Sequence, residues 1–373
     1  MPAILSENLD MGAFFMREKL KQFYIVLLVF ILTIMGQYGH VLQTEAVFST
    51  QKETVSAKSQ TGKRLTGQKS EEKVYASGMP IGIYIKTEGI LVLGLQQIDG
   101  KNSPASCKIK AGDYILKLNA QNITTKQQFI RLLQKNGEKE VVLTLKRKNK
   151  KIKVKVQPVY SAKNKCYQIG VWIRNDTQGI GTITFIREDG TFAALGHGIN
   201  DGDIGVRFLI EGGSAYRTNI SSILKGKSGM PGEIIGTIDY SPQNYLGEIY
   251  ANTNGILGKI TENKKEFFTD KKISIAKKSE VKTGKAYLRS SISGKSKDYS
   301  IEIEKVFFHE KNSLKTLKIR VTDSELITLT GGIIQGLSGS PILQNGKLVG
   351  AVTHVLIDNP QMGYGIFAES MLE

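Results

Sequence analysis

The stretch GGIIQGLSGSPILQNGKLVGAV, residues 331–352, places a glycine-rich turn directly before a β-hairpin. Asn345-Gly346 is a strong signal for a two-residue hairpin loop, because both positions favour positive φ. The second strand of this hairpin is expected over residues 348–355. The whole chain has 39 glycines against 8 prolines in 373 residues, with no fixed glycine period. This composition excludes collagen and favours many turns between short strands, so we expect a mainly β protein.

The glycine-rich turn also has the composition of a nucleophile loop. Glycines on both sides of Ser338 let the backbone turn sharply, so that the N–H groups of Gly336 and Ser338 can point into one hole. A serine hydroxyl is a poor nucleophile until a base takes its proton, and the oxyanion that forms needs preorganised N–H donors. We therefore predict Ser338 as the nucleophile, with Gly336 and Ser338 as the oxyanion hole. Ser340 is the less favoured serine, and a hairpin without chemistry is the alternative.

Four histidines occur in the chain, and His197 differs from the others in its setting. It follows a predicted hairpin over residues 183–195 and stands between Gly196 and Gly198. Small neighbours at a strand end expose an imidazole to a cleft, as a general base requires. His197 is therefore the candidate base, with a hydrogen-bonded loop histidine as the alternative. His354 alternates with valines and is expected on one face of a strand, where a role in a site is the less favoured interpretation.

The order of these motifs is similar to that of chymotrypsin-like serine peptidases. A histidine comes first, and G-x-S-G-x-P, a strand, an Asn-Gly turn and a second strand follow. The resemblance implies a double β-barrel peptidase domain over residues 168–373. Leu337 precedes Ser338 where the digestive enzymes have Asp, so activation by a new N-terminus that pairs with this Asp is not expected.

Residues 78–158 resemble a PDZ domain. They begin with a glycine-containing strand and continue with AGDYILKLN, residues 111–119, which is typical of a turn and core strand of that domain. Residues 125–133 follow as an amphipathic helix. In a PDZ domain an extended peptide adds to an open sheet edge beside such a helix. The resemblance implies that the peptide-binding residues are Ile81, Gly82 and Ile83. A small β domain without a ligand is the alternative.

Residues 23–36 form an apolar segment without charge that follows a basic stretch. The segment is shorter than the roughly 20 residues that cross a bilayer, so a removable signal peptide competes with an anchor. No small-x-small cleavage site follows, which favours the anchor. The positive-inside rule then places residues 1–22 in the cytoplasm and exports the rest of the chain. Residues 37–77 are rich in Ser, Thr and Gln and are predicted to be a flexible linker.

The formal net charge of +17 is compatible with binding to anionic surfaces. Nucleic acid is not the expected partner, because no aromatic residues are interleaved with the lysines of the densest basic run, residues 146–155. Nor does the sequence predict a cofactor or a metal. Gly226-Lys227-Ser228 lacks the glycine that a phosphate loop needs at position 221, and the histidines are too widely spaced for a metal cluster. The two cysteines, Cys107 and Cys166, allow one bridge at most.

Together, the apolar segment, the PDZ-like block, Gly196-His197-Gly198 and the Ser338 turn look like the stage IV sporulation protein B family. These are PDZ-containing serine peptidases of endospore-forming bacteria. The resemblance implies that Asp323 is the acid of a His197, Asp323, Ser338 triad. Its role would be to hold the imidazole tautomer and to stabilise the imidazolium. The other acids considered for this role are Asp201, Asp203 and Asp239.

The resemblance also implies a function. The enzyme would be an exported, membrane-anchored endopeptidase in the space between forespore and mother cell. It would cleave a membrane-bound regulatory protein, and itself, and so release the activation of a mother-cell sigma factor. A peptide segment or chain terminus would bind the PDZ domain. The alternative is a non-catalytic, membrane-tethered binding module in which the PDZ domain and the barrel only gather partners.

Overall fold

The computed structural model describes residues 72–261, 267, 271–308 and 314–372. The chain divides into two compact units, and these residues belong to the second, residues 69–373. The predicted segments 1–22 and 23–36, and most of the linker 37–77, lie outside the described residues. Within the described part, no helix is both long enough and apolar enough to span a membrane. The secondary structure there is mainly β, as predicted.

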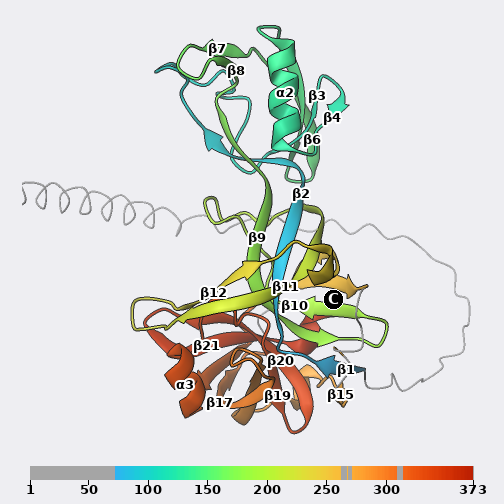
Figure 1. Ribbon diagram of the computed structural model, residues 1–373, viewed down its shortest axis with the longest axis vertical. Helices are drawn as coiled ribbons and strands as arrows, with labels where there is room; N and C mark the ends of the chain where they lie inside the picture. The colour runs from blue at the N-terminus through green and yellow to red at the C-terminus, as the bar shows by residue number, and fades with distance from the viewer. Residues whose placement is uncertain (1–71, 262–266, 268–270, 309–313, 373) are drawn as a thin grey trace, which may run out of the picture. The chain divides into compact units, whose positions relative to one another are not determined.

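Six strands close the first barrel (Figure 1). In order around the barrel they are β9 (Val171–Ile186), β10 (Thr191–Ala194), β14 (Ile256–Ile260), β13 (Tyr245–Asn252), β11 (Ile210–Leu224) and β2 (Pro80–Leu95). Pairing of β2 with β9 completes the ring. Alternate side chains point inward, and buried isoleucine, leucine and phenylalanine residues fill the interior.

Three short strands extend this sheet. They are β12 (Glu233–Ile238), which pairs with β11, and β1 (Lys73–Ala76), which pairs with β9 and with β15 (Ile273–Ser274). The 3-10 turns η1 (Pro242–Asn244) and η3 (Lys278–Glu280) lie in the connections. Because β1 is a paired strand, the C-terminal end of the predicted flexible linker is wrong: residues 73–76 are part of the sheet.

The second barrel is closed by six consecutive strands of the C-terminal region. They are β16 (Gly284–Ser290), β17 (Lys297–Val306), β18 (Leu317–Val321), β19 (Pro341–Gln344), β20 (Lys347–Leu356) and β21 (Asn359–Phe367). Helix α3 (Ser324–Thr330) precedes the turn that carries Ser338, and η4 (Ala368–Met371) follows β21. Asn345 (φ 51°) and Gly346 (φ 74°) turn the hairpin between β19 and β20, which confirms that prediction. Two barrels of this kind confirm the chymotrypsin-like fold expected from the sequence.

The PDZ domain is built on extensions of two barrel strands. The N-terminal part of β9 and the C-terminal part of β2 pair with each other beyond the barrel. The remaining elements are β3 (Tyr114–Leu118), β4 (Gln121–Asn122), α2 (Lys126–Asn136), β5 (Val141–Arg147), β6 (Lys150–Val156), β7 (Val159–Ser161) and β8 (Cys166–Gln168). Phe129 and Leu133 of α2 are buried against this sheet, as the helical periodicity predicts.

The boundary between PDZ domain and barrel differs from the prediction, because β2 and β9 each run through both. The register of β2 against β9 shifts between Lys86 and Leu91, and Gly89 there has φ of 76°. The barrel portion of β2 precedes this irregularity and the PDZ portion follows it. A sequence pattern cannot show that one continuous apolar strand contributes to two cores. The PDZ domain therefore starts later than residue 78 and includes the beginning of β9.

The predicted peptide-binding residues Ile81, Gly82 and Ile83 consequently belong to the barrel. Both of their backbone edges are paired, with β9 on one side and β11 on the other. The two isoleucines are buried in the barrel interior. A Cβ on Gly82 would come within 2.7 Å of the side chain of Ile238. An incoming peptide strand has no free edge there, so this assignment is wrong.

Candidate active site

The turn that carries Ser338 is anchored to the first barrel by hydrogen bonds. Thr182 of β9 donates its hydroxyl to Gly336 O (2.8 Å) and its N–H to Ser338 O (3.1 Å). Thr184 donates its hydroxyl to Gly339 O (2.7 Å). Gly336 and Gly339 have φ of 97° and 95°, a region that glycine adopts without a steric penalty. These contacts fix the predicted nucleophile at the junction of the two barrels.

The backbone of this turn has the donors that an oxyanion hole needs. Among the described residues, the N–H groups of Gly336 and Ser338 have no hydrogen-bond partner. The N–H of the intervening Leu337, by contrast, donates to Ile334 O (3.1 Å). Free N–H groups beside a nucleophile are available to a developing oxyanion. The structure thus leaves the two predicted donors unoccupied.

The two serines of the turn differ in exposure. Ser338 is half-buried, and its hydroxyl donates to the carbonyl of Thr353 on β20 (3.1 Å). Ser340 is fully buried, and its hydroxyl has no hydrogen-bond partner among the described residues. A substrate carbonyl can reach only an accessible hydroxyl. The geometry therefore favours Ser338 over Ser340 as the nucleophile.

His197 lies directly after β10, where Leu195 (φ 69°) and Gly196 (φ 67°) turn the chain. Its Nδ1 is 3.0 Å from the carbonyl oxygen of Gly198. When Nδ1 carries the proton and donates to this carbonyl, Nε2 has a free lone pair, as a general base requires. Burial lowers the pKa of His197 below 6.5; the Gly198 carbonyl raises it, and the positive charge of Arg207 lowers it further. A neutral imidazole at pH 7 suits the predicted role.

Asp323 makes no hydrogen bond or ion pair with His197 among the described residues. It is the N-cap of α3, and its Oδ1 accepts from the N–H groups of Glu325 (3.0 Å) and Leu326 (3.1 Å). Its Oδ2 accepts from Ser300 N–H (3.2 Å). These bonds satisfy orphan donors at a helix start, which is a structural use of the carboxylate. The geometry therefore gives no support to a triad role for Asp323.

The other candidate acids are also engaged elsewhere. Asp201 is buried and pairs with Arg174, which also binds Asp203 (2.8 Å). Asp239 accepts from Ser241 N–H (2.9 Å) in an exposed loop. Within the described part of the chain, no carboxylate contacts His197.

The residue that does contact His197 is His354 of β20. The two ring centroids are 5.6 Å apart, with an angle of 41° between the ring planes. The alternation with valines correctly predicts His354 on a strand. Sequence reasoning gave it little weight as a site residue, because only the pairing of strands shows that this part of β20 passes Ser338 and His197.

A cleft of about 670 Å³ is lined in part by Gly336, one of the two predicted oxyanion-hole donors. Its other lining residues come from Gln178–Ile180 of β9, from β12, from Tyr240 and from Gln335. A lining of β-strands is suited to a peptide in extended conformation. The cleft therefore includes residues of the turn that carries the predicted nucleophile.

A family model described as SpoIVB peptidase S55 matches residues 165–372, more than half of the chain. The chain belongs to the SpoIVB peptidase S55 family. It is thus a serine peptidase, as the sequence predicts. A PDZ domain model matches residues 100–147, which lie in the domain described above. The sequence has no significant match among curated proteins.

Several solved structures match parts of this chain at low sequence identity. The PDZ domain of the SdrC-like protein from Listeria monocytogenes is 19% identical; the match covers 24% of this chain and 90% of that one, with a TM-score of 0.21. The active form of the Rv3671c protease from M. tuberculosis is 15% identical over 52% of this chain and 72% of that one, with a TM-score of 0.29. The HtrA-type protease AlgW with a decapeptide is 9% identical over 80% and 63%, with a TM-score of 0.32. The family assignment rests on the family model alone.

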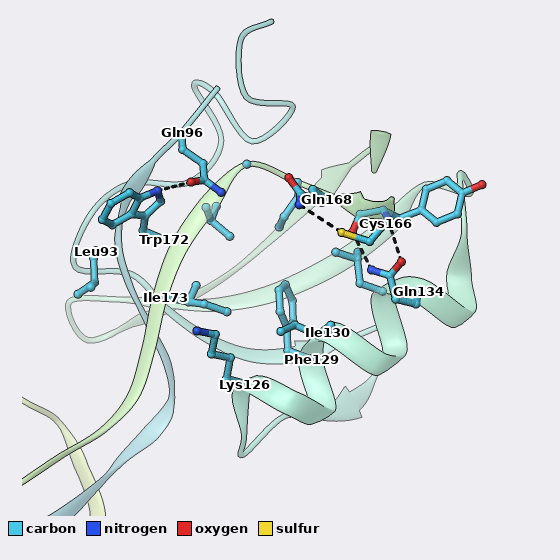
Figure 2. A pocket seen from close by; sticks show the side chains of 15 residues that line it. Leu93, Gln96, Lys126, Phe129, Ile130, Gln134, Cys166, Gln168, Trp172 and Ile173 are labelled. Carbon is cyan, nitrogen blue, oxygen red and sulfur yellow. Dashed lines mark hydrogen bonds between the residues drawn. The ribbon is translucent and has the colours of Figure 1, made fainter. Parts of the chain in front are cut away.

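The PDZ domain of this S55 peptidase has a groove of about 370 Å³, shown in Figure 2. One wall is α2, with Phe129 and Ile130, and the other is formed by residues 166–173. Trp172 is 60% exposed beside it, and its indole N–H donates to Gln96. An apolar groove between a helix and a strand is where a PDZ domain takes a peptide. This groove, and not residues 81–83, is therefore the candidate peptide site of the PDZ domain.

A sequence signal for this strand exists. Gly170 (φ 67°) is followed by Val171, Trp172 and Ile173, a glycine-led apolar strand of the kind expected earlier in the chain. It was missed because it lies C-terminal to the other PDZ elements. Cys166 also lines the groove and Cys107 is exposed; both thiols are free, so the single possible bridge is not formed.

Proposed function

We propose that this SpoIVB-family enzyme is an endopeptidase that acts through an acyl-enzyme on Ser338. The Ser338 oxygen attacks the scissile carbonyl while Nε2 of His197 takes the hydroxyl proton. The N–H groups of Gly336 and Ser338 stabilise the oxyanion. His197 then gives its proton to the leaving amine, and water hydrolyses the ester by the same route. The unoccupied N–H pair beside an accessible hydroxyl is the observation that supports this mechanism.

A fluorophosphonate probe tests the mechanism directly, since it phosphonylates only an activated serine. Wild-type enzyme should be labelled, and peptide mapping should locate the label on Ser338. Ser338→Ala should not be labelled. An unlabelled wild-type enzyme that also cleaves no peptide would favour the non-catalytic binding module instead.

The biological substrate that we propose is a membrane-bound regulatory protein, with the enzyme itself as a second substrate. Cleavage would take place outside the cytoplasm, between forespore and mother cell, and would lead to sigma-factor activation in the mother cell. The family assignment supports this proposal, together with the apolar segment 23–36 and the basic stretch before it. A reporter fused after Glu373 should be active only outside the cytoplasm. A reporter that is active only in the cytoplasm would contradict the orientation.

The PDZ groove is proposed to bind a peptide segment or chain terminus by strand addition. Trp172 is the single tryptophan of the chain and lies at the groove, so its fluorescence reports on binding without a label. Peptides selected from a library with free C-termini should shift the Trp172 emission to shorter wavelength as the indole is covered. Ile130→Asp, on the opposite wall, should abolish the shift. A shift that Ile130→Asp leaves unchanged would place the peptide elsewhere.

A further inference from the structure

The groove beside α2 is closed at one end by a side chain. Gln134 donates its amide N–H to Tyr167 O (2.8 Å), and its amide oxygen accepts from Tyr167 N–H (2.8 Å). Both main-chain groups of Tyr167 therefore already have the partners that a ligand strand would supply. A peptide that pairs with the strand after Gly170 cannot continue its pairing past this point. The groove is therefore suited to a chain terminus.

The segment from Ile169 to Ile173 has main-chain groups available to such a terminus. Residues 171–173 pair with β2 on one side, and no described strand pairs with their other side. The N–H groups of Ile169 and Gly170 have no hydrogen-bond partner in the described part of the chain. Gly170 has φ of 67°, and successive N–H groups at such a turn form a concavity that binds anions. A terminal carboxylate fits these donors, which places the last residue of a ligand at the Gln134 end.

One cation lies at the opposite end of α2. Lys126 is the first residue of this helix and the only charged residue among the described residues that line the groove. Its side chain points toward Ile173 (Figure 2), and its ammonium makes no ion pair or hydrogen bond with any described residue. A ligand side chain laid against this ammonium is favoured when it is anionic and disfavoured when it is cationic.

The spacing along α2 determines where the acidic side chain stands in the ligand. Lys126 and Ile130 both line the groove and are separated by one helical turn, about 6 Å along the axis. In an extended peptide, side chains that point the same way are two residues apart, which is about 6.7 Å. A ligand whose last side chain contacts Ile130 and Leu133 therefore presents the side chain two residues earlier to Lys126.

We propose that the groove binds a chain terminus that ends in an apolar residue and has an acidic side chain two residues earlier, and that Lys126 selects this acid. The inference rests on the peptide binding proposed above for the PDZ domain. An ion pair with an exposed lysine contributes modestly, so Glu at this ligand position should bind about two- to fivefold tighter than Gln. Lys at the same position should bind more weakly than Gln, because two ammonium groups repel each other.

The test uses the full-length chain and the emission of Trp172. Three pools of peptides with free C-termini end in Leu and carry Glu, Gln or Lys two residues earlier, with the other positions mixed. The concentration that gives half of the emission shift is measured for each pool at low ionic strength. Wild type should prefer Glu to Gln and Gln to Lys, whereas Lys126→Glu should reverse this order. The Glu pool with amidated C-termini should bind at least about tenfold more weakly, because it lacks the charged acceptor for the free N–H groups.

Arg131→Glu is the matched control, since Arg131 is an exposed cation of the same helix that does not line the groove. It should retain the wild-type order of the pools. Glu is favourable in the first turn of a helix, so Lys126→Glu should fold, and thermal unfolding verifies this for both variants.

Three results would overturn the proposal: equal binding of the three pools by wild type, a reversed order in Arg131→Glu, or amidated termini that bind like free ones. Each of these leaves peptide binding by the groove intact. A Trp172 emission that no pool shifts in wild type would instead contradict the peptide binding on which the proposal rests.

Discussion

Two serines lie in the nucleophile turn, and they differ in what surrounds their hydroxyls. Ser338→Ala removes the half-buried hydroxyl that donates to Thr353 O and should abolish peptide cleavage and self-cleavage with little change in stability. His197→Ala should match it within an order of magnitude, because a nucleophile and its base act as a unit. Ser340→Ala removes only a buried hydroxyl without a hydrogen-bond partner, so it should retain substantial activity. The rate of peptide cleavage by each variant tests these expectations. An active Ser338→Ala would contradict the mechanism.

The pH dependence of labelling should follow His197. Burial and Arg207 hold its pKa below 6.5, so the imidazole stays neutral as the pH falls past that value. Labelling should be lost only when the pH falls through the lowered pKa, so the acid midpoint should lie below pH 6.5. Arg207→Gln removes a positive charge, which raises the pKa of His197 and moves the midpoint to higher pH. Arg131→Gln, on α2 in the PDZ domain, is the control and should leave it unchanged.

At the scale of elements, helix α3 depends on its cap. Asp323→Ala leaves the N–H groups of Glu325 and Leu326 without their acceptor and should lower the free energy of unfolding by about 1 kcal/mol. Asp323→Ser retains an N-cap oxygen and should cost less. Urea denaturation measures both. Equal stability of Asp323→Ala and wild type would show that the cap contributes nothing.

Two glycines of similar φ test how much the close packing of the Ser338 turn against β9 contributes to stability and activity. Gly339 (φ 95°) has no room for a side chain, because a Cβ would lie 2.1 Å from Thr182 O. Gly346 (φ 74°) is open, with nothing within 4 Å of such a Cβ. Gly346→Ala should cost only the backbone strain, about 1–2 kcal/mol. Gly339→Ala should cost more and abolish labelling, since the turn must separate from β9. Equal unfolding midpoints for the two variants would contradict this account.

At the scale of the molecule, the PDZ domain contacts the loop that follows His197. Tyr114 of β3 is buried with Leu91 and Phe208, and its hydroxyl accepts from Leu209 N–H (2.9 Å). Tyr114→Phe leaves this N–H without a partner and should destabilise the protein by about 1–3 kcal/mol. Tyr160→Phe, at an exposed position on β7, should have no effect. Thermal unfolding compares the two, and equal melting temperatures would show that this contact does not stabilise the chain.

The sequence by itself determined the local features of this protein. The Asn345-Gly346 hairpin, helix α2 and the turn around Ser338 follow from turn chemistry and periodicity, which act over a few residues. The two barrels were implied by the resemblance of the histidine and serine motifs to chymotrypsin-like peptidases, and the family by those motifs together with the apolar segment and the PDZ-like block. The hairpin, the helix and the turn could be predicted because neighbours in the chain dictate them.

Only the tertiary structure decided which distant residues meet. It moved the PDZ strand from Ile81–Ile83 to residues 170–173, because β2 and β9 each pass through two cores. It also placed His354, and not Asp323, beside His197. A local pattern makes Asp323 a helix cap as readily as a catalytic acid. The register of β20 against its neighbours sets which side chain reaches the base, and that register depends on the packing of both barrels.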